Sequence, residues 1–349
     1  LTSMVFVLNG DGWGSSVPWT GTAAIDVYDA TPAVDELHGG DGNDRLYGKR
    51  GDDTIYGDGG NDLLQGDEGN DTIYGGTGND QMHGNAGDDY LDGGADTDTA
   101  NYSSATSGVT IDLNIAGAQN TVGAGIDTLV SIESIFGSAY DDILTGDAGN
   151  NGITAGSGND IIDAGGGDDF VQGGGGVDTI IYTSASSGVT MDIGNNAGQI
   201  TGGSGRDTVQ GFENLTGSAF ADILTGNIGA NVVLGAGGDD VIIGEGGADT
   251  LDGGAGTDTV DYNLAAAGVN ANLTTGLATD DGDGSADTLA NFENITGSAF
   301  NDVLTGEAGA NIILGGNGND TIAGRGGVDT LTGGAGTDTA DYSGAAAGV

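Results

Sequence analysis

A nine-residue repeat governs the segment 39–101 of this 349-residue chain. Divided into nines, the segment is GGDGNDRLY, GKRGDDTIY, GDGGNDLLQ, GDEGNDTIY, GGTGNDQMH, GNAGDDYLD and GGADTDTAN. Glycine opens every line, aspartate stands sixth in every line, and glycine stands fourth in all but the last, where Asp96 replaces it. Seven repeats in unbroken register require equivalent turns, so the segment must fold by stacking one local conformation on itself.

Each nonapeptide divides into a turn and a short strand. The glycines at positions one and four suit backbone with positive φ or a close approach between chain segments. The last three residues, such as Thr54-Ile55-Tyr56, have the types that favour a strand. Position eight faces opposite to its neighbours, so we predict that it points inward. The resulting apolar ladder comprises Leu46, Ile55, Leu64, Ile73, Met82, Leu91 and Ala100.

The turn has the chemistry of a hard-cation site. Ca²⁺ takes about six to eight oxygen ligands, from carboxylates and carbonyls. A glycine-rich turn leaves its carbonyl oxygens unobstructed, and the sixth-position aspartate adds charge. Aspartate is also a good turn former, but that property does not explain its fixed sixth place beside a fixed fourth glycine. The pattern therefore indicates calcium.

These repeats resemble the nonapeptide G-G-x-G-x-D-x-U-x of the RTX (repeats-in-toxin) family. The resemblance implies an all-β fold, a right-handed parallel β-roll or β-solenoid with two nonapeptides per turn. Calcium would lie between repeats n and n+2, held by carbonyls two and four with aspartate six of one repeat and by carbonyls one and three with aspartate six of the other. The first such site would be Gly40, Gly42, Asp44, Gly57, Gly59 and Asp62, and Asp62 would serve two ions.

Carried along the chain, the same pattern assigns two sets of calcium ligands. The aspartates are Asp44, Asp53, Asp62, Asp71, Asp80, Asp89, Asp98, Asp142, Asp160, Asp169, Asp178, Asp222, Asp240, Asp249, Asp258, Asp302, Asp320, Asp329 and Asp338. The backbone carbonyls are those of Gly40, Gly42, Lys49, Gly51, Gly57, Asp58, Gly59, Gly60, Gly66, Asp67, Glu68, Gly69, Gly75, Gly76, Thr77, Gly78, Gly84, Ala86, Gly93, Ala95, Gly156, Gly158, Gly173, Gly175, Ala236, Gly238, Gly253, Ala255, Gly316, Gly318, Gly333 and Ala335.

Beyond the first block the pattern recurs with a period of 80 residues, marked by Tyr102, Tyr182, Tyr262 and Tyr342. We therefore predict nonapeptide blocks at 39–101, 137–181, 217–261 and 297–341. Inserts occupy 102–136, 182–216 and 262–296, and a further insert begins at 342–349. Residues 1–38 form an N-terminal cap or the end of a preceding domain, in which MVFVL and AAIDVYD are candidate strands. Trp13 and Trp19 would cover the open end of the ladder, with a carbohydrate platform as the alternative.

The five repeats of each later block are not equivalent. The second has asparagine at position six, Asn151, Asn231 or Asn311, and should bind calcium weakly or not at all. The third and fifth form the best pair, for example Asp160 with Asp178. Counting pairs gives five sites in the first block and three in each later block, 14 in all.

The inserts should be further solenoid turns without the calcium loop, because phrases such as GVTIDL and DTLVSIESI suit strands. We expect the recurring tyrosines, with Phe220 and Phe300, to be packing plugs rather than ligands. The stretch TDDGDGSAD contains Asp280, Asp281, Asp283 and Asp287 but lacks the glycine and glutamate of an EF-hand. A solvated acidic loop is favoured there over an additional ion site.

Composition restricts the partners. The chain has a formal net charge of −48, with only 5 lysines and arginines, and no cysteine. Such a polyanion is unsuited to nucleic acid, a disulfide framework is excluded, and no apolar run is long enough to span a membrane. Without cations the chain should repel itself. His38 and His83 have no partner at zinc spacing, so we expect both at the surface.

No H-E-x-x-H or G-x-S-x-G motif occurs, which argues against an enzyme. We therefore expect a calcium-stiffened extracellular repeat region of a secreted bacterial surface, matrix or adhesin-like protein, with self-association or a surface polysaccharide as its contacts. The alternatives are an accessory module of a secreted protease, lipase or alginate epimerase, or part of an RTX toxin. The family resemblance implies type I secretion, and the ends at Leu1 and Val349 suggest a piece of a longer chain.

Overall fold

The computed structural model describes residues 18–344, and every regular element within them is a β-strand. The chain divides into two compact units, Leu1–Asp178 and Thr179–Val349. The described part has no helix long and apolar enough to span a membrane. MVFVL and Trp13 lie outside the described residues, so the predictions made for them are not addressed by the structure.

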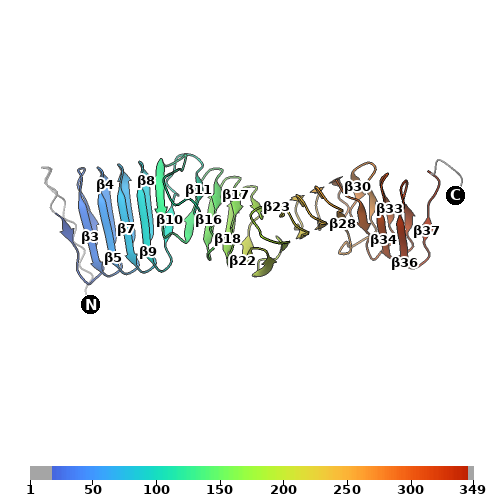
Figure 1. The fold of residues 1–349 in the computed structure, drawn as a ribbon, viewed down its shortest axis with the longest axis horizontal. Coiled ribbons are helices and arrows are strands. Elements are labelled where there is room, and N and C mark those ends of the chain that lie inside the picture. The colour runs from blue at the N-terminus through green and yellow to red at the C-terminus, as the bar shows by residue number, and fades with distance from the viewer. Residues whose placement is uncertain (1–17, 345–349) are drawn as a thin grey trace. The chain divides into compact units, whose positions relative to one another are not determined.

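The first unit consists of stacked strands that alternate between facing sheets (Figure 1). One sheet has the order β1 (Trp19–Thr20), β3 (Glu36–Asp41), β5 (Thr54–Gly59), β7 (Thr72–Thr77), β9 (Tyr90–Ala95), β13 (Ile126–Val130) and β12 (Gln119–Asn120). The facing strands are β2 (Val27–Asp29), β4 (Arg45–Arg50), β6 (Leu63–Glu68), β8 (Gln81–Ala86), β10 (Thr99–Asn101), β14 (Ser134–Phe136), β16 (Gly152–Ser157) and β18 (Phe170–Gly175). A third stack contains β11 (Thr110–Asp112), β15 (Ile143–Thr145) and β17 (Ile161–Asp163).

The second unit repeats this plan. One stack has the order β19 (Thr179–Ile181), β23 (Asn214–Thr216), β25 (Val232–Leu234), β27 (Thr250–Asp252), β31 (Asp287–Ala290), β30 (Leu277–Asp280), β29 (Asn270–Asn272), β33 (Val303–Thr305), β35 (Thr321–Ala323) and β37 (Thr339–Ala340). The other has the order β20 (Thr190–Asp192), β24 (Ile223–Thr225), β26 (Val241–Ile243), β28 (Thr259–Asp261), β32 (Asn294–Thr296), β34 (Ile312–Asn317) and β36 (Thr330–Ala335). A hairpin joins β21 (Gln199–Gly202) and β22 (Gly205–Gln210).

The strand register confirms that repeats n and n+2 are neighbours. Strands β4 and β6 are parallel, and Leu46 pairs with Leu64, two nonapeptides further along. In the same way Ile55 pairs with Ile73. The eighth-position side chains therefore stack, and those from Leu46 to Ala100 are 0–1% exposed, as predicted. Each fully buried leucine or isoleucine stabilises the fold by about 1.5–3 kcal/mol, which makes this ladder the core.

The strands of the first block are longer than the sequence predicted. Most span six residues, because pairing continues beyond the apolar triplet through the first three positions of the next repeat. Gly40 thus pairs with Asp58 and Asp41 with Gly59. The start of each glycine-rich turn is therefore held in a parallel ladder, which fixes where its carbonyl groups point.

The inserts continue the stack, as predicted. Strand β13 pairs with β9 through Leu129 and Leu91, and β14 pairs with β10 through Ile135 and Ala100. Each insert also contains an antiparallel pairing that the sequence analysis did not foresee: β12 with β13, β21 with β22, and β30 with both β29 and β31. The hairpin of β21 and β22 turns at Gly202 and Gly205, whose positive φ angles of 70° and 106° suit a tight reversal.

The plug prediction is right for Tyr102, Tyr182 and Tyr262, but wrong for Tyr342, which is 53% exposed, and for the phenylalanines. Tyr102, Tyr182 and Tyr262 are 1–4% exposed. Phe220 and Phe300 are both 45% exposed, because they stand at position four of their repeats, in the turn rather than in the inward-facing strand. The apolar residues that are buried at the corresponding corner of each insert are Ile132, Phe212 and Phe292.

Candidate calcium sites

The sixth-position aspartates join successive turns through one carboxylate oxygen. Asp62 Oδ1 accepts a hydrogen bond of 2.7 Å from the backbone N–H of Asp44, and Asp80 Oδ1 accepts one of 2.8 Å from that of Asp62. The same bond recurs between every pair of neighbouring turns in the first block. Because these aspartates are almost fully buried, their position is determined by the ladder and not by solvent.

The second carboxylate oxygen is the unusual atom. Within residues 18–344, a set of sixth-position Oδ2 atoms is buried and has no hydrogen-bond donor. These atoms belong to Asp44, Asp53, Asp62, Asp71, Asp80, Asp89, Asp98, Asp160, Asp240, Asp249, Asp258 and Asp320. A buried anionic oxygen without a partner costs several kcal/mol, so a fold with seven in succession requires positive charge at these points.

Burial changes the acidity of these groups accordingly. Loss of solvation raises the pKa of Asp53 and Asp80 to about 7, although each accepts a backbone hydrogen bond that lowers it. The neighbouring aspartates of the same ladder raise both values further. In the absence of a cation, the carboxylates would therefore bind protons near neutral pH.

Carbonyl oxygens converge on the same points. A Cβ atom added to Gly57 would lie 2.5 Å from Asp62 Oδ2 and 2.5 Å from the carbonyl oxygen of Gly75, the first residue of the next turn. A Cβ on Gly60 would lie 1.4 Å from the carbonyl oxygen of Gly42. The glycine at position one thus leaves a space beside a carboxylate and a carbonyl oxygen, a donor set that fits Ca²⁺, whereas the glycine at position four allows neighbouring turns to come into backbone contact.

The third-position carbonyls are partly used. Gly59 accepts a hydrogen bond of 2.7 Å from the N–H of Gly42, and Thr77 accepts one of 2.8 Å from that of Gly60. A carbonyl oxygen has two lone pairs, so this bond leaves one for an ion. No group of three or more acidic or histidine side chains within the described ranges could hold a metal by itself. An ion at these points would therefore need backbone carbonyls in addition to the aspartates.

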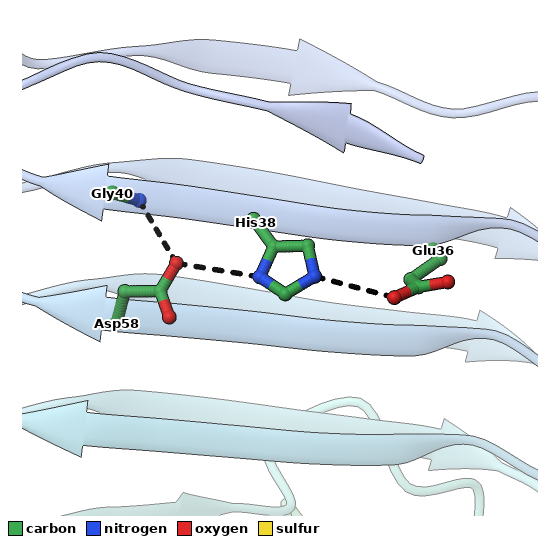
Figure 2. Close-up of polar contacts among 4 residues, drawn as sticks. All are labelled: Glu36, His38, Gly40 and Asp58. Carbon is green, nitrogen blue, oxygen red and sulfur yellow. Dashed lines mark hydrogen bonds and ion pairs between the residues drawn. The ribbon is translucent and has the colours of Figure 1, made fainter. Parts of the chain in front are cut away.

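Side chains at position two lie on the outside of the turn. His38 lies between Glu36 and Asp58, at 3.3 and 3.5 Å, and Asp58 also accepts a bond of 3.3 Å from the N–H of Gly40 (Figure 2). The His38 ring stacks on Tyr56 at 4.4 Å. His38 thus lies at the surface, as expected, but it is not isolated, since it bridges two acids. Its neighbour Asp58 can offer its carbonyl inward while its carboxylate faces outward.

At the asparagine positions, the side-chain amide makes hydrogen bonds that leave no unpaired oxygen for an ion to complete. Asn151 Nδ2 donates to the carbonyl of Glu133 at 3.2 Å, and its Oδ1 accepts the N–H of Asp147 at 2.8 Å. Asn231 and Asn311 donate in the same way to Glu213 and Glu293, both at 2.7 Å. The amide thus supplies the donor that the Oδ2 of an aspartate cannot, which supports the prediction that these positions bind calcium weakly or not at all.

In several repeats, a serine at position two donates hydrogen bonds to both oxygens of the sixth-position aspartate. Asp142 Oδ2 accepts the N–H of Ser138 at 2.6 Å, and its Oδ1 accepts the Ser138 hydroxyl at 2.7 Å. Asp222 and Asp302 have the same contacts with Ser218 and Ser298. Although the family pattern assigns these three aspartates to calcium, their oxygens already have donors.

The ladder also includes residues that the sequence analysis did not assign to it. Asp26 and Asp35 use Oδ2 to accept the N–H and hydroxyl of Thr22 and Thr31, and their own N–H groups bond to Asp44 and Asp53. In the inserts the same place is taken by Asp127, which accepts the Tyr102 hydroxyl at 3.1 Å. A sequence signal for Asp26 and Asp35 existed, because each stands two residues before an apolar or aromatic residue, Tyr28 or Leu37, as position six stands before position eight. The signal was hidden because position four of these repeats is alanine and not glycine.

Backbone conformation separates the two classes of repeat. We call an aspartate open when its buried Oδ2 has no hydrogen-bond donor, and closed when a donor is present. Position two has positive φ in the repeats with an open aspartate, even where the residue is not glycine, as at Lys49 (81°), Asp67 (79°) and Ala236 (71°). Ser138 and Asp147, at position two of closed repeats, do not have positive φ. Their N–H groups instead point at the sixth side chain. Of the 14 expected pairs, eight have positive φ at position two of both repeats, five in the first block and one in each later block.

Replacing Asp62 and Asn151 by alanine should have different consequences. Asp62→Ala should remove two ions, because its carboxylate belongs to two neighbouring pairs of turns, one with Asp44 and one with Asp80. Asn151→Ala should remove none but lower the free energy of unfolding by about 1–3 kcal/mol, because the Glu133 carbonyl and the Asp147 N–H each lose a hydrogen bond to the buried amide. Native mass spectrometry in calcium would count the ions. Equal losses in the two variants would contradict the assignment.

Comparison with known proteins agrees with this geometry. The family model of the RTX calcium-binding nonapeptide repeat matches residues 29–64, 38–73, 65–100, 131–162, 153–180, 193–213, 210–242, 225–260, 287–322 and 305–340. These segments together cover more than half of the chain. A search of curated proteins found no match. The chain therefore belongs to the family of RTX calcium-binding nonapeptide repeat proteins, whose repeats imply calcium binding and here form a parallel β-roll.

Proposed function

We propose that this chain is the calcium-stiffened structural repeat region of a secreted bacterial surface, matrix or adhesin-like protein, without catalytic activity of its own. The observation that carries the proposal is the run of open carboxylate oxygens from Asp44 to Asp98. Each is buried in a ladder whose neighbouring turns add further negative charge. While these carboxylates are ionised, the stacked turns are stable only when cations bind between them. The stiffness of the chain should therefore depend on the calcium concentration.

Basic side chains do not perform this role. In the described chain, Lys49 lies 3.4 Å from Asp29 and Arg50 lies 3.0 Å from Glu68, and all four side chains are at least 42% exposed. Exposed ion pairs contribute little to stability, about 0–1 kcal/mol. Neither pair reaches the buried oxygens, so mobile cations have to supply the compensating charge.

The expected place of action follows from calcium supply. Extracellular modules bind calcium at about 10⁻⁴–10⁻³ M, which is far above cytosolic levels. The chain would leave the cell unfolded, consistent with type I secretion, and fold outside. The outer face of β3, β5, β7 and β9 carries a row of rings, in which His38, Tyr56 and Tyr74 are stacked and Tyr90 is tilted against Tyr74. Such a row of rings supports contact with a polysaccharide through its apolar sugar faces.

Single-molecule force measurements test the stiffening. The chain, held by handles at its two ends, should resist extension in millimolar calcium and lengthen in discrete steps as turns are pulled from the roll. In calcium-free buffer it should extend as a flexible coil at low force. Magnesium at the same concentration serves as the control and should behave like calcium-free buffer. Identical force–extension curves with and without calcium would rule out a calcium-stiffened role.

A further inference from the structure

The third insert has two acidic residues in one loop where the first two inserts have neutral ones. The aligned segments are NTVGAGID at 120–127, ITGGSGRD at 200–207 and DDGDGSAD at 280–287. Asp281 replaces a threonine that stands at 121 and 201, and Asp283 replaces a glycine that stands at 123 and 203. The first insert therefore shows how this loop is built when both acids are absent.

In the first insert a threonine hydroxyl satisfies the buried aspartate. Thr121 Oγ1 lies 3.1 Å from Asp127 Oδ2 and 3.0 Å from the Gly125 carbonyl, so its hydrogen can serve either acceptor. Asp127 also accepts the Tyr102 hydroxyl at 3.1 Å and the N–H of Asp89 at 3.0 Å. Both oxygens of Asp127 thus have donors.

In the third insert that hydroxyl donor is replaced by a carboxylate. Asp281 is 1% exposed, and its Oδ1 accepts the N–H groups of Asp283 at 3.1 Å and Ser285 at 3.2 Å. Its Oδ2 is buried and has no hydrogen-bond partner in the described structure. Asp287, also 1% exposed, keeps the Tyr262 hydroxyl at 3.1 Å. A buried oxygen without a donor therefore stands where the sister loops have a hydroxyl.

Two further carboxylates add to the negative charge. Asp283 is exposed at the loop surface and is fixed by the N–H groups of Gly247 at 3.0 Å and Ser285 at 2.8 Å. Asp249 is 2% exposed, and its Oδ2 is another oxygen without a donor. The loop thus concentrates acid where its sisters have neutral residues.

We propose that Asp281 and Asp283 form a binding site for a divalent cation that prefers oxygen ligands, Ca²⁺ first, with the remaining ligands from backbone carbonyls and water. This site belongs to the insert and not to a nonapeptide pair, so it goes beyond the proposed function. The expectation of a solvated acidic loop is wrong for Asp281 and Asp287, because both are buried. The competing arrangement is a single proton shared by Asp281 and Asp283.

The sister inserts provide matched variants for the test. The double variant Asp281→Thr with Asp283→Gly restores the residues that both sister inserts have at these two positions, so we expect it to fold. In saturating calcium at pH 8, native mass spectrometry should count one ion fewer than in the parent, with an unchanged circular dichroism spectrum. The reciprocal variant, Thr121→Asp with Gly123→Asp, should bind one ion more.

The outcomes separate a cation from a shared proton. An unchanged ion count in the folded double variant would overturn the proposal, since the pair would then hold a proton. A folded reciprocal variant that gains no ion would overturn it as well. If the double variant does not fold, the reciprocal variant decides alone, because it adds the site to an insert that already folds without it.

Discussion

Removal of calcium should unfold most of this chain, and magnesium should not restore it. The expected far-ultraviolet circular dichroism is that of a disordered chain in chelator and of β-structure in millimolar calcium. The physical reason is the open ladder of the first block, in which seven buried oxygens lack donors. An unfolded chain cannot bring together carbonyls from neighbouring turns, so the free energy of ion binding becomes free energy of folding. Magnesium requires tight octahedral geometry and gives up water reluctantly.

The control separates coordination from screening. With a formal net charge of −48, any salt weakens self-repulsion, so sodium chloride at matched ionic strength must accompany each measurement. Only calcium should restore the β signal. Shared aspartates such as Asp62 couple neighbouring ions, so the calcium titration should be cooperative. A full β signal in chelator would show that the apolar ladder suffices without ions.

The fold was predictable because one local rule repeats. The eighth-position ladder follows from the nonapeptide, and the pairing of repeats n and n+2 was implied by the resemblance to the RTX family. Both are confirmed by the burial of Leu46 and its pairing with Leu64. The exposure of Phe220 was missed because position four belongs to the turn, where an apolar side chain has no inward direction. Hydrophobicity alone does not reveal that distinction.

The division into open and closed aspartates was less accessible to sequence reasoning. It depends on the φ angle at position two and on a donor four residues before the carboxylate, as with Ser138 and Asp142. The sequence signal existed as serine or threonine at position two, but its meaning requires the hydrogen bonds. The significance of Asp281 likewise appears only when its buried oxygen is compared with the hydroxyl of Thr121.

Acid should partly replace calcium in folding this chain. Burial raises the pKa of Asp44, Asp62, Asp71 and Asp98 to about 6, and that of Asp53, Asp80 and Asp89 to about 7. In the unfolded chain these groups titrate near their ordinary value of about 3.9. Between about pH 4 and pH 7 the calcium-free folded state therefore binds more protons than the unfolded state. Its stability must rise as pH falls through this window and be lost as pH rises above 7.

Calcium reverses the sign of this dependence. The ion needs the ionised carboxylates, so protons compete with it, and the apparent affinity should fall about tenfold per pH unit below about pH 6 for each carboxylate that must lose a proton. The measurement is circular dichroism at pH 5 and pH 8, with and without calcium, in buffer freed of calcium by a resin because chelators weaken in acid. Calcium-free protein should contain more β-structure at pH 5 than at pH 8.

A matched pair of variants distinguishes buried protons from a general loss of charge. Asp53→Asn removes a titrating group whose carboxylate is 1% exposed, whereas Asp41→Asn removes the same charge from an exposed position. Only Asp53→Asn should flatten the pH dependence of the calcium-free state, because folding buries the Asp53 carboxyl group and raises its pKa, whereas the Asp41 side chain stays exposed. Equal effects of the two substitutions would mean that acid acts by lowering net charge throughout the chain. Less β-structure at pH 5 than at pH 8 would mean that the open oxygens are stabilised as anions, and the case for cations in the ladder would fail with it.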